Sequence, residues 1–199
     1  MTKNNNSAAY ILAGILVLAV ISIGYLLLRN KPSVPPQAGK EASLNDLLDK
    51  PLPAIKLFDK DGKEVSMENF KGKNIVLFFS EGLMCYPACW NQIAAFGEDA
   101  RFNTADTVAL SVVADSSKDW EKAIAKMPKL ASASTLFDAG AAVSRQLGLL
   151  SSGSSMHKGS LPGHTYIVLD RQGIVRYVFD DQNMALNNDL LLEKIAKFN

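Results

Sequence analysis

The chain has two cysteines, and both lie in one short stretch, SEGLMCYPACW, at residues 80–90. Cys85 and Cys89 are four residues apart, so in a helix they would lie one turn apart on the same face. Their Cα atoms would then be roughly 6 Å apart, which is within reach of a disulfide. Two thiols this close can exchange disulfides, hold a metal ion, or simply be small buried hydrophobic side chains.

The pair is expected at the junction of a strand and a helix. NIVLFFS at 74–80 is a continuous apolar run that predicts a strand buried on both faces. The segment 87–102 predicts a helix, and Pro87 suits its first turn. A cysteine near a helix N-terminus is reactive, because unpaired N–H groups and the helix dipole stabilise its thiolate. Cys85 is therefore predicted to be the nucleophile.

Short strand-like runs alternate with helical patterns along the rest of the chain. This alternation predicts an α/β sandwich with a mixed central sheet flanked by helices. The one long irregular segment is the Ser/Gly-rich stretch 151–164. The expected elements are a hairpin (54–58 with 63–66), strand 74–80, helix 87–102, strand 107–114, helix 116–127, a further short strand, helix 138–148, a hairpin (164–170 with 174–179) and a closing helix at 187–198.

The first 50 residues differ from the rest. Ala8 to Leu28 is a run of 21 residues without a charge, and as a helix it spans the roughly 30 Å of a bilayer core. We expect residues 1–30 to be an uncleaved N-terminal transmembrane anchor, with a long signal peptide as the alternative. Residues 31–50 are expected to be a proline-containing linker with one short helix that starts at Ser43, and residues 51–199 the folded domain.

These features predict a single-pass membrane protein that meets the lipid bilayer through residues 8–28. Only Lys3 precedes the apolar run, whereas Arg29 and Lys31 follow it, so the positive-inside rule read literally keeps the domain in the cytoplasm. Because the imbalance is only one or two charges, the rule does not decide the orientation. We expect the soluble domain to lie on the extracytoplasmic side.

Charge and motifs argue against other function classes. The 21 basic and 20 acidic residues nearly cancel, so no field of one sign attracts nucleic acid. The glycine-containing stretches lack the G-x-x-x-x-G-K-[ST] spacing of a nucleotide-binding loop. We therefore expect no nucleic-acid partner and no cofactor.

Several segments together resemble the thioredoxin-fold redoxin group, which includes peroxiredoxin-like (AhpC/TSA) proteins and membrane-anchored thiol:disulfide proteins. They run from about residue 51 to the end: DKDG ahead of FKGKNIVLFFS, the cysteine loop (residues 80–90), LSVVADSSKDW, LFDAGAAVSRQLGLL and GHTYIVLDRQGIVRYVF. The resemblance implies a thioredoxin-like sandwich and a thiol-dependent oxidoreductase. In that enzyme Cys85 attacks a disulfide or a peroxide, Cys89 resolves the intermediate, and an external thiol reductant resets the pair.

The chain departs from peroxiredoxins at three positions. Peroxiredoxins carry a proline seven residues and a threonine three residues before the peroxidatic cysteine, where this chain has Phe78 and Gly82. They carry an arginine where this chain has His164. The missing threonine hydroxyl favours disulfide exchange over peroxide reduction. His164 is predicted to lie beside the cysteines as the third site residue, where it favours the thiolate or handles a proton.

Two alternatives remain. C-x-x-x-C with one distant histidine also resembles Sco-type copper chaperones, and this resemblance makes Cys85, Cys89 and His164 copper ligands, since two thiolates and an imidazole suit copper. The other alternative is a redoxin-fold module without catalysis.

Two further residues near these segments have weaker assignments. Glu81 is expected to face solvent, with a role as proton acceptor as the alternative. His157 is expected to be a solvated loop histidine, with a ligand role beside Met156 as the alternative.

Overall fold

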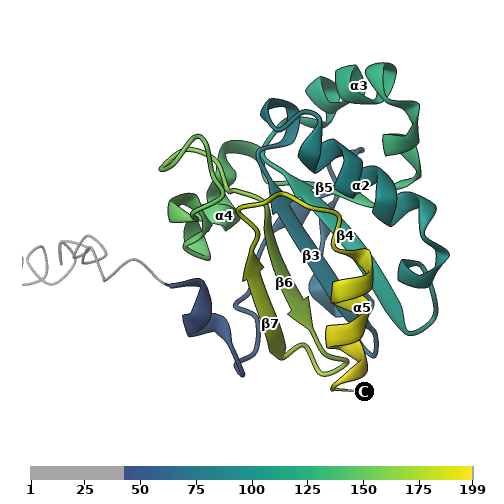
Figure 1. The fold of residues 1–199 in the computed structure, drawn as a ribbon, viewed down its shortest axis with the longest axis vertical. Coiled ribbons are helices and arrows are strands. Elements are labelled where there is room, and N and C mark those ends of the chain that lie inside the picture. Colours follow the sequence, from purple (N-terminus) through teal and green to yellow (C-terminus); the bar gives the residue numbers. More distant parts are fainter. Residues whose placement is uncertain (1–42, 199) are drawn as a thin grey trace, which may run out of the picture. The chain divides into compact units, whose positions relative to one another are not determined.

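The computed structural model describes residues 43–198 (Figure 1). The predicted anchor at 1–30 and most of the predicted linker lie outside the described residues. Within residues 43–198, no helix is both long enough and apolar enough to cross a bilayer.

The core of the described part is one mixed sheet of seven strands, in the order β2-β1-β5-β4-β3-β6-β7. β3 pairs in parallel with β4, and β4 with β5, while the other neighbouring pairs are antiparallel. The predicted mixed α/β architecture is therefore confirmed. The strands are β1 (Leu57–Phe58), β2 (Glu64–Val65), β3 (Asn74–Ser80), β4 (Thr107–Val113), β5 (Thr135–Phe137), β6 (Thr165–Leu169) and β7 (Val175–Asp180).

Helices cover both faces of the sheet, and β3 shows why its sequence is continuously apolar. All seven residues of β3 are buried, because alternate side chains enter two different hydrophobic clusters. Val76 and Phe78 pack on the side of α2, α3 and α5, whereas Leu77 and Phe79 pack on the side of α4. The helices are α2 (Ala88–Glu98), α3 (Ser117–Lys126), α4 (Ala142–Gln146) and α5 (Asn188–Ala196).

Most predicted elements occur within a few residues of their expected bounds, but the helix predicted at 138–148 is much shorter. Ala141 has a positive φ of 55°, which breaks the helix, so α4 begins only at Ala142. The buried Asp138 carboxylate holds this kink by accepting hydrogen bonds from the backbone N–H groups of Val143 and Ser144, at 2.9 and 2.8 Å. The short helix expected after Ser43 is present as a 3₁₀ turn, Leu44–Leu47.

The sheet topology brings distant segments to one edge. β3 and β4 are parallel and in register, so both end at the same edge, where Ser80 lies beside Val113. β6 runs antiparallel to β3, with Thr165 opposite Phe79, so β6 starts where β3 ends. This edge therefore brings together the cysteine loop, the loop after β4 and the residue before β6.

Candidate active site

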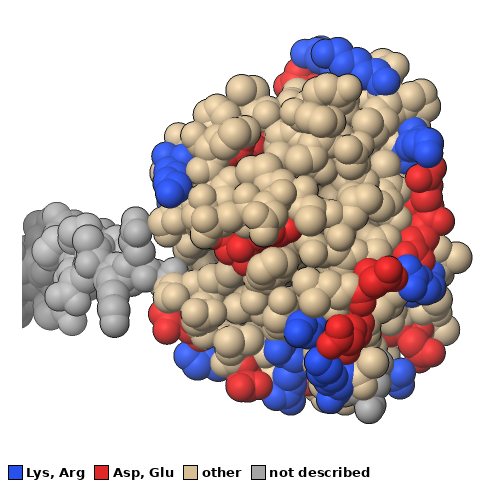
Figure 2. Space-filling view, viewed as in Figure 1, with Lys and Arg blue, Asp and Glu red and all other residues tan. Residues whose placement is uncertain are grey.

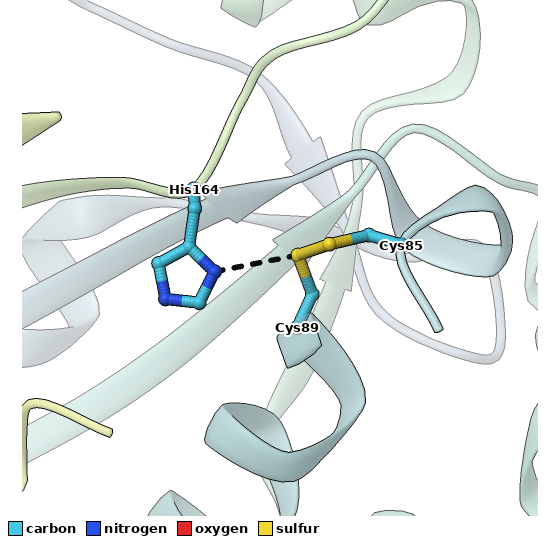
Figure 3. A group of neighbouring side chains, drawn as sticks. All are labelled: Cys85, Cys89 and His164. Atoms are coloured by element: carbon cyan, nitrogen blue, oxygen red, sulfur yellow. Dashed lines mark hydrogen bonds between the residues drawn. A yellow bond between two sulfur atoms is a disulfide. The ribbon is translucent and has the colours of Figure 1, made fainter. Parts of the chain in front are cut away.

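The cysteines bridge the end of a 3₁₀ turn and the first turn of α2. Cys85 follows the turn Gly82–Met84, and α2 begins three residues later, at Ala88. The backbone N–H of Cys89 donates to the carbonyl oxygen of Cys85 at 3.0 Å, so one helical turn separates the two residues. Their Cα atoms are 5.4 Å apart and their sulfurs form a disulfide (Figure 3). The predicted disulfide reach is confirmed.

Gly82 holds the cysteine loop against the loop after β4. Its φ is +61°, and a Cβ at this position would overlap the Oδ2 atom of Asp115. That same Oδ2 atom accepts a hydrogen bond from the backbone N–H of Leu83 at 2.9 Å, and the Gly82 carbonyl accepts one from Trp90 Nε1 at 3.0 Å. The position where peroxiredoxins carry a threonine thus has no room here for a side chain.

Glu81 ties the cysteine loop to the segment 151–164. The expectation that it faces solvent was wrong, because only 2% of Glu81 is exposed. Its Oε1 atom accepts hydrogen bonds from the backbone N–H groups of Met156 and His157, at 2.6 and 3.0 Å, and from Ser155 Oγ at 3.1 Å. Its Oε2 atom lies 2.9 Å from His157 Nδ1. A buried carboxylate needs such partners, so we assign Glu81 a structural role.

His157 is a partly solvated loop histidine that also contacts Glu81. Its side chain is 40% exposed, and its Nδ1 atom lies 2.9 Å from Glu81 Oε2. Met156, the other residue weighed as a ligand, is one of the most exposed hydrophobic side chains in the described part of the chain.

His164 lies where the sequence predicted it, against the cysteine pair. It immediately precedes β6, and its Nδ1 atom is 3.4 Å from Cys89 Sγ (Figure 3). Its Nε2 atom is 2.7 Å from the hydroxyl oxygen of Tyr166. The ring packs edge-on against Phe78, with a centroid distance of 4.6 Å. The histidine contacts Cys89, not Cys85, and this distinction was not available from the sequence.

Burial keeps the His164 ring uncharged. The side chain has no exposed surface, and this burial lowers the pKa of His164 to about 4, although the Asp181 carboxylate, the Ala185 backbone and the Asp180 carboxylate act in the opposite direction. Burial also raises the pKa of Tyr166 well above its ordinary value, so its hydroxyl stays protonated. At neutral pH the group beside the disulfide is therefore a neutral imidazole.

The site is closed over both sulfurs in the disulfide form. Cys89 is fully buried and Cys85 is 3% exposed, whereas the neighbours of Cys85 in the chain, Met84 and Tyr86, are 56% and 65% exposed. On the face drawn in Figure 2, charged side chains gather at the lower end, and smaller charged groups lie at the top and the sides. An incoming group would thus meet the side chains of Met84 and Tyr86 first and would reach Cys85 before Cys89.

The three site residues also have the composition of a soft-metal site. The Sγ atoms of Cys85 and Cys89 and a ring nitrogen of His164 lie within 4.8 Å of one another. In the disulfide form neither sulfur is a thiolate, so metal binding would require reduction of the pair first.

Two residues of the site were missed at the sequence level. Tyr166 is two residues after His164, and side chains two residues apart in a strand share a face. This alternation could have identified Tyr166 as a neighbour of His164. Asn187 contacts the Tyr166 hydroxyl from the loop before α5, and no sequence pattern indicates that contact. The two tryptophans, Trp90 and Trp120, are buried core residues.

Known proteins match this chain in sequence and in fold. A family model described as Redoxin matches residues 47–189. A chloroplastic peroxiredoxin Q of Suaeda salsa is 36% identical over 136 residues, which cover 65% of this chain and 58% of the relative. One from Sedum lineare is 35% identical, covering 65% of this chain and 67% of the relative. This chain thus spans less than two thirds of the length of several of the relatives that it matches.

Solved structures share the fold at lower identity. Peroxidoxin BcpB from Mycobacterium tuberculosis superposes with a TM-score of 0.62 at 20% identity, covering 76% of this chain and 97% of the other. A putative protein disulfide isomerase from Bacteroides thetaiotaomicron gives a TM-score of 0.55 at 17% identity, covering 76% and 87%. The architecture in Figure 1 is therefore a thioredoxin-like sandwich of the kind that the sequence resemblance implied.

Proposed function

The chain belongs to the Redoxin family, and on this premise we propose that it is a thiol-dependent oxidoreductase that cycles between the Cys85–Cys89 disulfide and two thiols. Cys85 is the nucleophile and Cys89 the resolving thiol. The observation that carries the proposal is the disulfide itself, set at the end of β3 and in contact with a buried, neutral His164. An external thiol, a small molecule or a protein, reduces the pair after each turnover.

The substrate is a disulfide in preference to a peroxide. The names of the peroxiredoxin Q relatives support peroxide, but Gly82 provides no hydroxyl group to hold one, and its Cβ position is filled by Asp115. His164 stands in place of the arginine that would stabilise the leaving oxygen. Its ring is uncharged, and its two nitrogens already contact Cys89 Sγ and the Tyr166 hydroxyl. Disulfide exchange needs neither group, since a thiolate is both the attacking and the leaving species.

The access to Cys85 supports a protein partner. The buried disulfide requires the loop around Cys85 to shift before an external sulfur can approach in line. The exposed side chains of Met84 and Tyr86 offer apolar contacts to a protein surface, and the burial of those side chains would offset the cost of the shift.

The test is a single-turnover measurement on the reduced full-length chain in detergent. On mixing with a protein disulfide, both thiols should disappear together, as measured by alkylation and mass spectrometry. Cys85→Ser should abolish the reaction, and His164→Ala should slow it about tenfold, because Cys89, which attacks the mixed disulfide as the resolving thiolate, loses its polar neighbour. His157→Ala is the matched control, since His157 contacts neither sulfur, and it should leave the rate within about twofold. Unchanged rates in Cys85→Ser, together with unchanged metal binding, would leave only the non-catalytic redoxin module.

A second candidate is a copper chaperone, favoured by the 4.8 Å grouping of Cys85, Cys89 and His164. Soft thiolates select Cu(I), and imidazole suits copper in either state. Titration of the reduced chain with Cu(I) against a competing chelator separates the two functions. Stoichiometric uptake that requires all three residues, together with slow thiol oxidation, would favour the chaperone over the enzyme.

Membrane tethering is part of the proposal and rests on the uncharged run at residues 8–28. The domain then acts at a bilayer surface on its extracytoplasmic side, with no role for nucleic acid. Labelling of reduced cysteines in intact cells with a membrane-impermeant reagent tests the orientation. Labelling only after cell lysis would put the domain in the cytoplasm.

A further inference from the structure

A line of buried polar groups leads from Cys89 through His164 and Tyr166 to Asn187. The far end of the line sets its direction. Asn187 Nδ2 lies 2.8 Å from Asp181 Oδ2 and 3.0 Å from the Ala185 carbonyl oxygen. Because a carbonyl oxygen and a carboxylate only accept, the nitrogen of the Asn187 amide must face them.

Asp181 is an acceptor because it is ionised. Burial opposes its charge, but hydrogen bonds from Asn187 and from the backbone N–H groups of Ala185 and Asn183 keep the pKa of Asp181 below its ordinary value. The carboxylate thus has no proton to give, and the orientation of the Asn187 amide follows.

The same amide nitrogen orients the Tyr166 hydroxyl. Asn187 Nδ2 is 3.2 Å from the Tyr166 hydroxyl oxygen, and an amide nitrogen donates and does not accept. The amide nitrogen therefore cannot take the Tyr166 proton, which points to the other polar neighbour, His164 Nε2, at 2.7 Å.

One ring hydrogen remains to be located. A neutral histidine carries its proton on one nitrogen and accepts on the other. With Nε2 accepting from Tyr166, the proton of His164 is on Nδ1, and Nδ1 is the atom 3.4 Å from Cys89 Sγ. The N–H group therefore points at one sulfur of the disulfide.

We propose that Tyr166 and Asn187 are positioning residues that hold His164 in the Nδ1–H tautomer, so that Cys89 is the sulfur that leaves as a thiolate when an external thiol attacks Cys85. This inference rests on the proposed function and assigns its reductive half-reaction. A neutral sulfur is a weak acceptor and a thiolate is a strong one, so the Nδ1–H group favours the state in which the disulfide has opened.

The step balances without a proton transfer. The external thiolate attacks Cys85 Sγ and forms a new S–S bond, while the Cys85–Cys89 bond breaks and its electron pair goes to Cys89 Sγ. The Cys89 thiolate accepts the hydrogen bond from His164 Nδ1–H, and the ring stays neutral. A second thiolate of the donor then attacks the mixed disulfide and releases Cys85 as a thiolate. The donor is oxidised to a disulfide and the pair is reduced.

The direct test is the ¹⁵N spectrum of the histidine rings in the labelled full-length chain in detergent. The chain has only two histidines, and His157→Ala assigns them. At neutral pH, His164 should show a protonated Nδ1 and an unprotonated Nε2. A protonated Nε2 in the wild type would overturn the inference without any further variant, and would leave the oxidoreductase proposal standing.

Tyr166→Phe removes the hydroxyl and keeps the ring, which stacks on Phe78 at 4.8 Å and so should still pack. The spectrum of His164 should then shift towards the Nε2–H tautomer. The equilibrium constant for reduction of the disulfide by glutathione should fall about fivefold, because the thiolate loses part of a hydrogen bond. Asn187→Leu should act in the same direction.

Tyr177→Phe is the matched control, because it removes a tyrosine hydroxyl from the neighbouring strand β7 and should change neither quantity. A Tyr166→Phe variant that changes the tautomer but not the equilibrium constant would overturn the inference. If instead the tautomer responds as expected but the wild-type chain exchanges no disulfide, the proposed function fails and the assigned tautomer stands.

Discussion

Each of the two histidines of this chain lies beside the cysteine loop, but their surroundings differ. His164 is fully buried, and its ring contacts a sulfur and a tyrosine hydroxyl. His157 is partly exposed, and its ring contacts the carboxylate of Glu81. The first environment makes a neutral donor directed at a reacting atom, and the second attaches a loop to a buried carboxyl group. The same side chain thus belongs to the chemistry in one region and to the scaffold in the other.

The largest effect is expected at Gly82, which lies between the two regions. Gly82→Ala should reduce the free energy of unfolding by about 4 kcal/mol, through the positive φ and the overlap with Asp115. Urea unfolding measures this change. Gly62→Ala is the control, because Gly62 has a φ of +77° with open space around it, and it should cost about 1 kcal/mol. Equal costs at both positions would mean that Asp115 does not define the loop.

Acid should reveal the burial of His164. The unfolded chain takes up a proton on this residue near pH 6.5, whereas the folded chain does so only near the lowered pKa of about 4. Between these values the unfolded state binds more protons, so stability should fall with falling pH, by about 3 kcal/mol in all. In His164→Leu this part of the pH dependence should disappear, and in His157→Leu it should remain. An unchanged slope in His164→Leu would contradict the buried neutral ring.

The region around Glu81 and His157 should lose stability when the Glu81 carboxylate is removed. Glu81→Ala leaves the buried N–H groups of Met156 and His157 without their acceptor, and should reduce the free energy of unfolding by about 2 kcal/mol. Glu81→Gln keeps one acceptor oxygen and should cost less. Neither change should alter the ring tautomer of His164. If either Glu81 substitution changed the ring tautomer of His164, the two regions would be coupled.

The smallest effect is expected for the ring of His157. His157→Ala removes one contact of a partly exposed side chain, and should cost about 0.5–1 kcal/mol in urea unfolding. The backbone N–H of His157 still donates to Glu81 in the variant, so the loop should stay attached. A cost as large as that of Glu81→Ala would mean that the ring, and not the backbone, holds this loop.

Local patterns were sufficient for most of the fold. The strand at 74–80, the helix at 116–127 and the hairpin that contains β6 and β7 each occur within a few residues of the predicted bounds, because burial on both faces, helical periodicity and turn chemistry act over a few residues. The helix expected at 138–148 was too long, because the Asp138 hydrogen bonds that hold the kink depend on a side chain folding back, which no periodicity reveals.

The residue types and their spacing were enough to identify the cysteine pair, its disulfide reach and His164 as its neighbour. They left open which sulfur the histidine contacts, which ring nitrogen carries the proton, and whether Glu81 meets water or a loop. Those answers depend on contacts between residues up to 76 positions apart in the chain. A side chain's charge and hydrogen bonds are set by what surrounds it, and these surroundings exist only after the sheet has brought the end of β3, the start of β6 and the loop before α5 together.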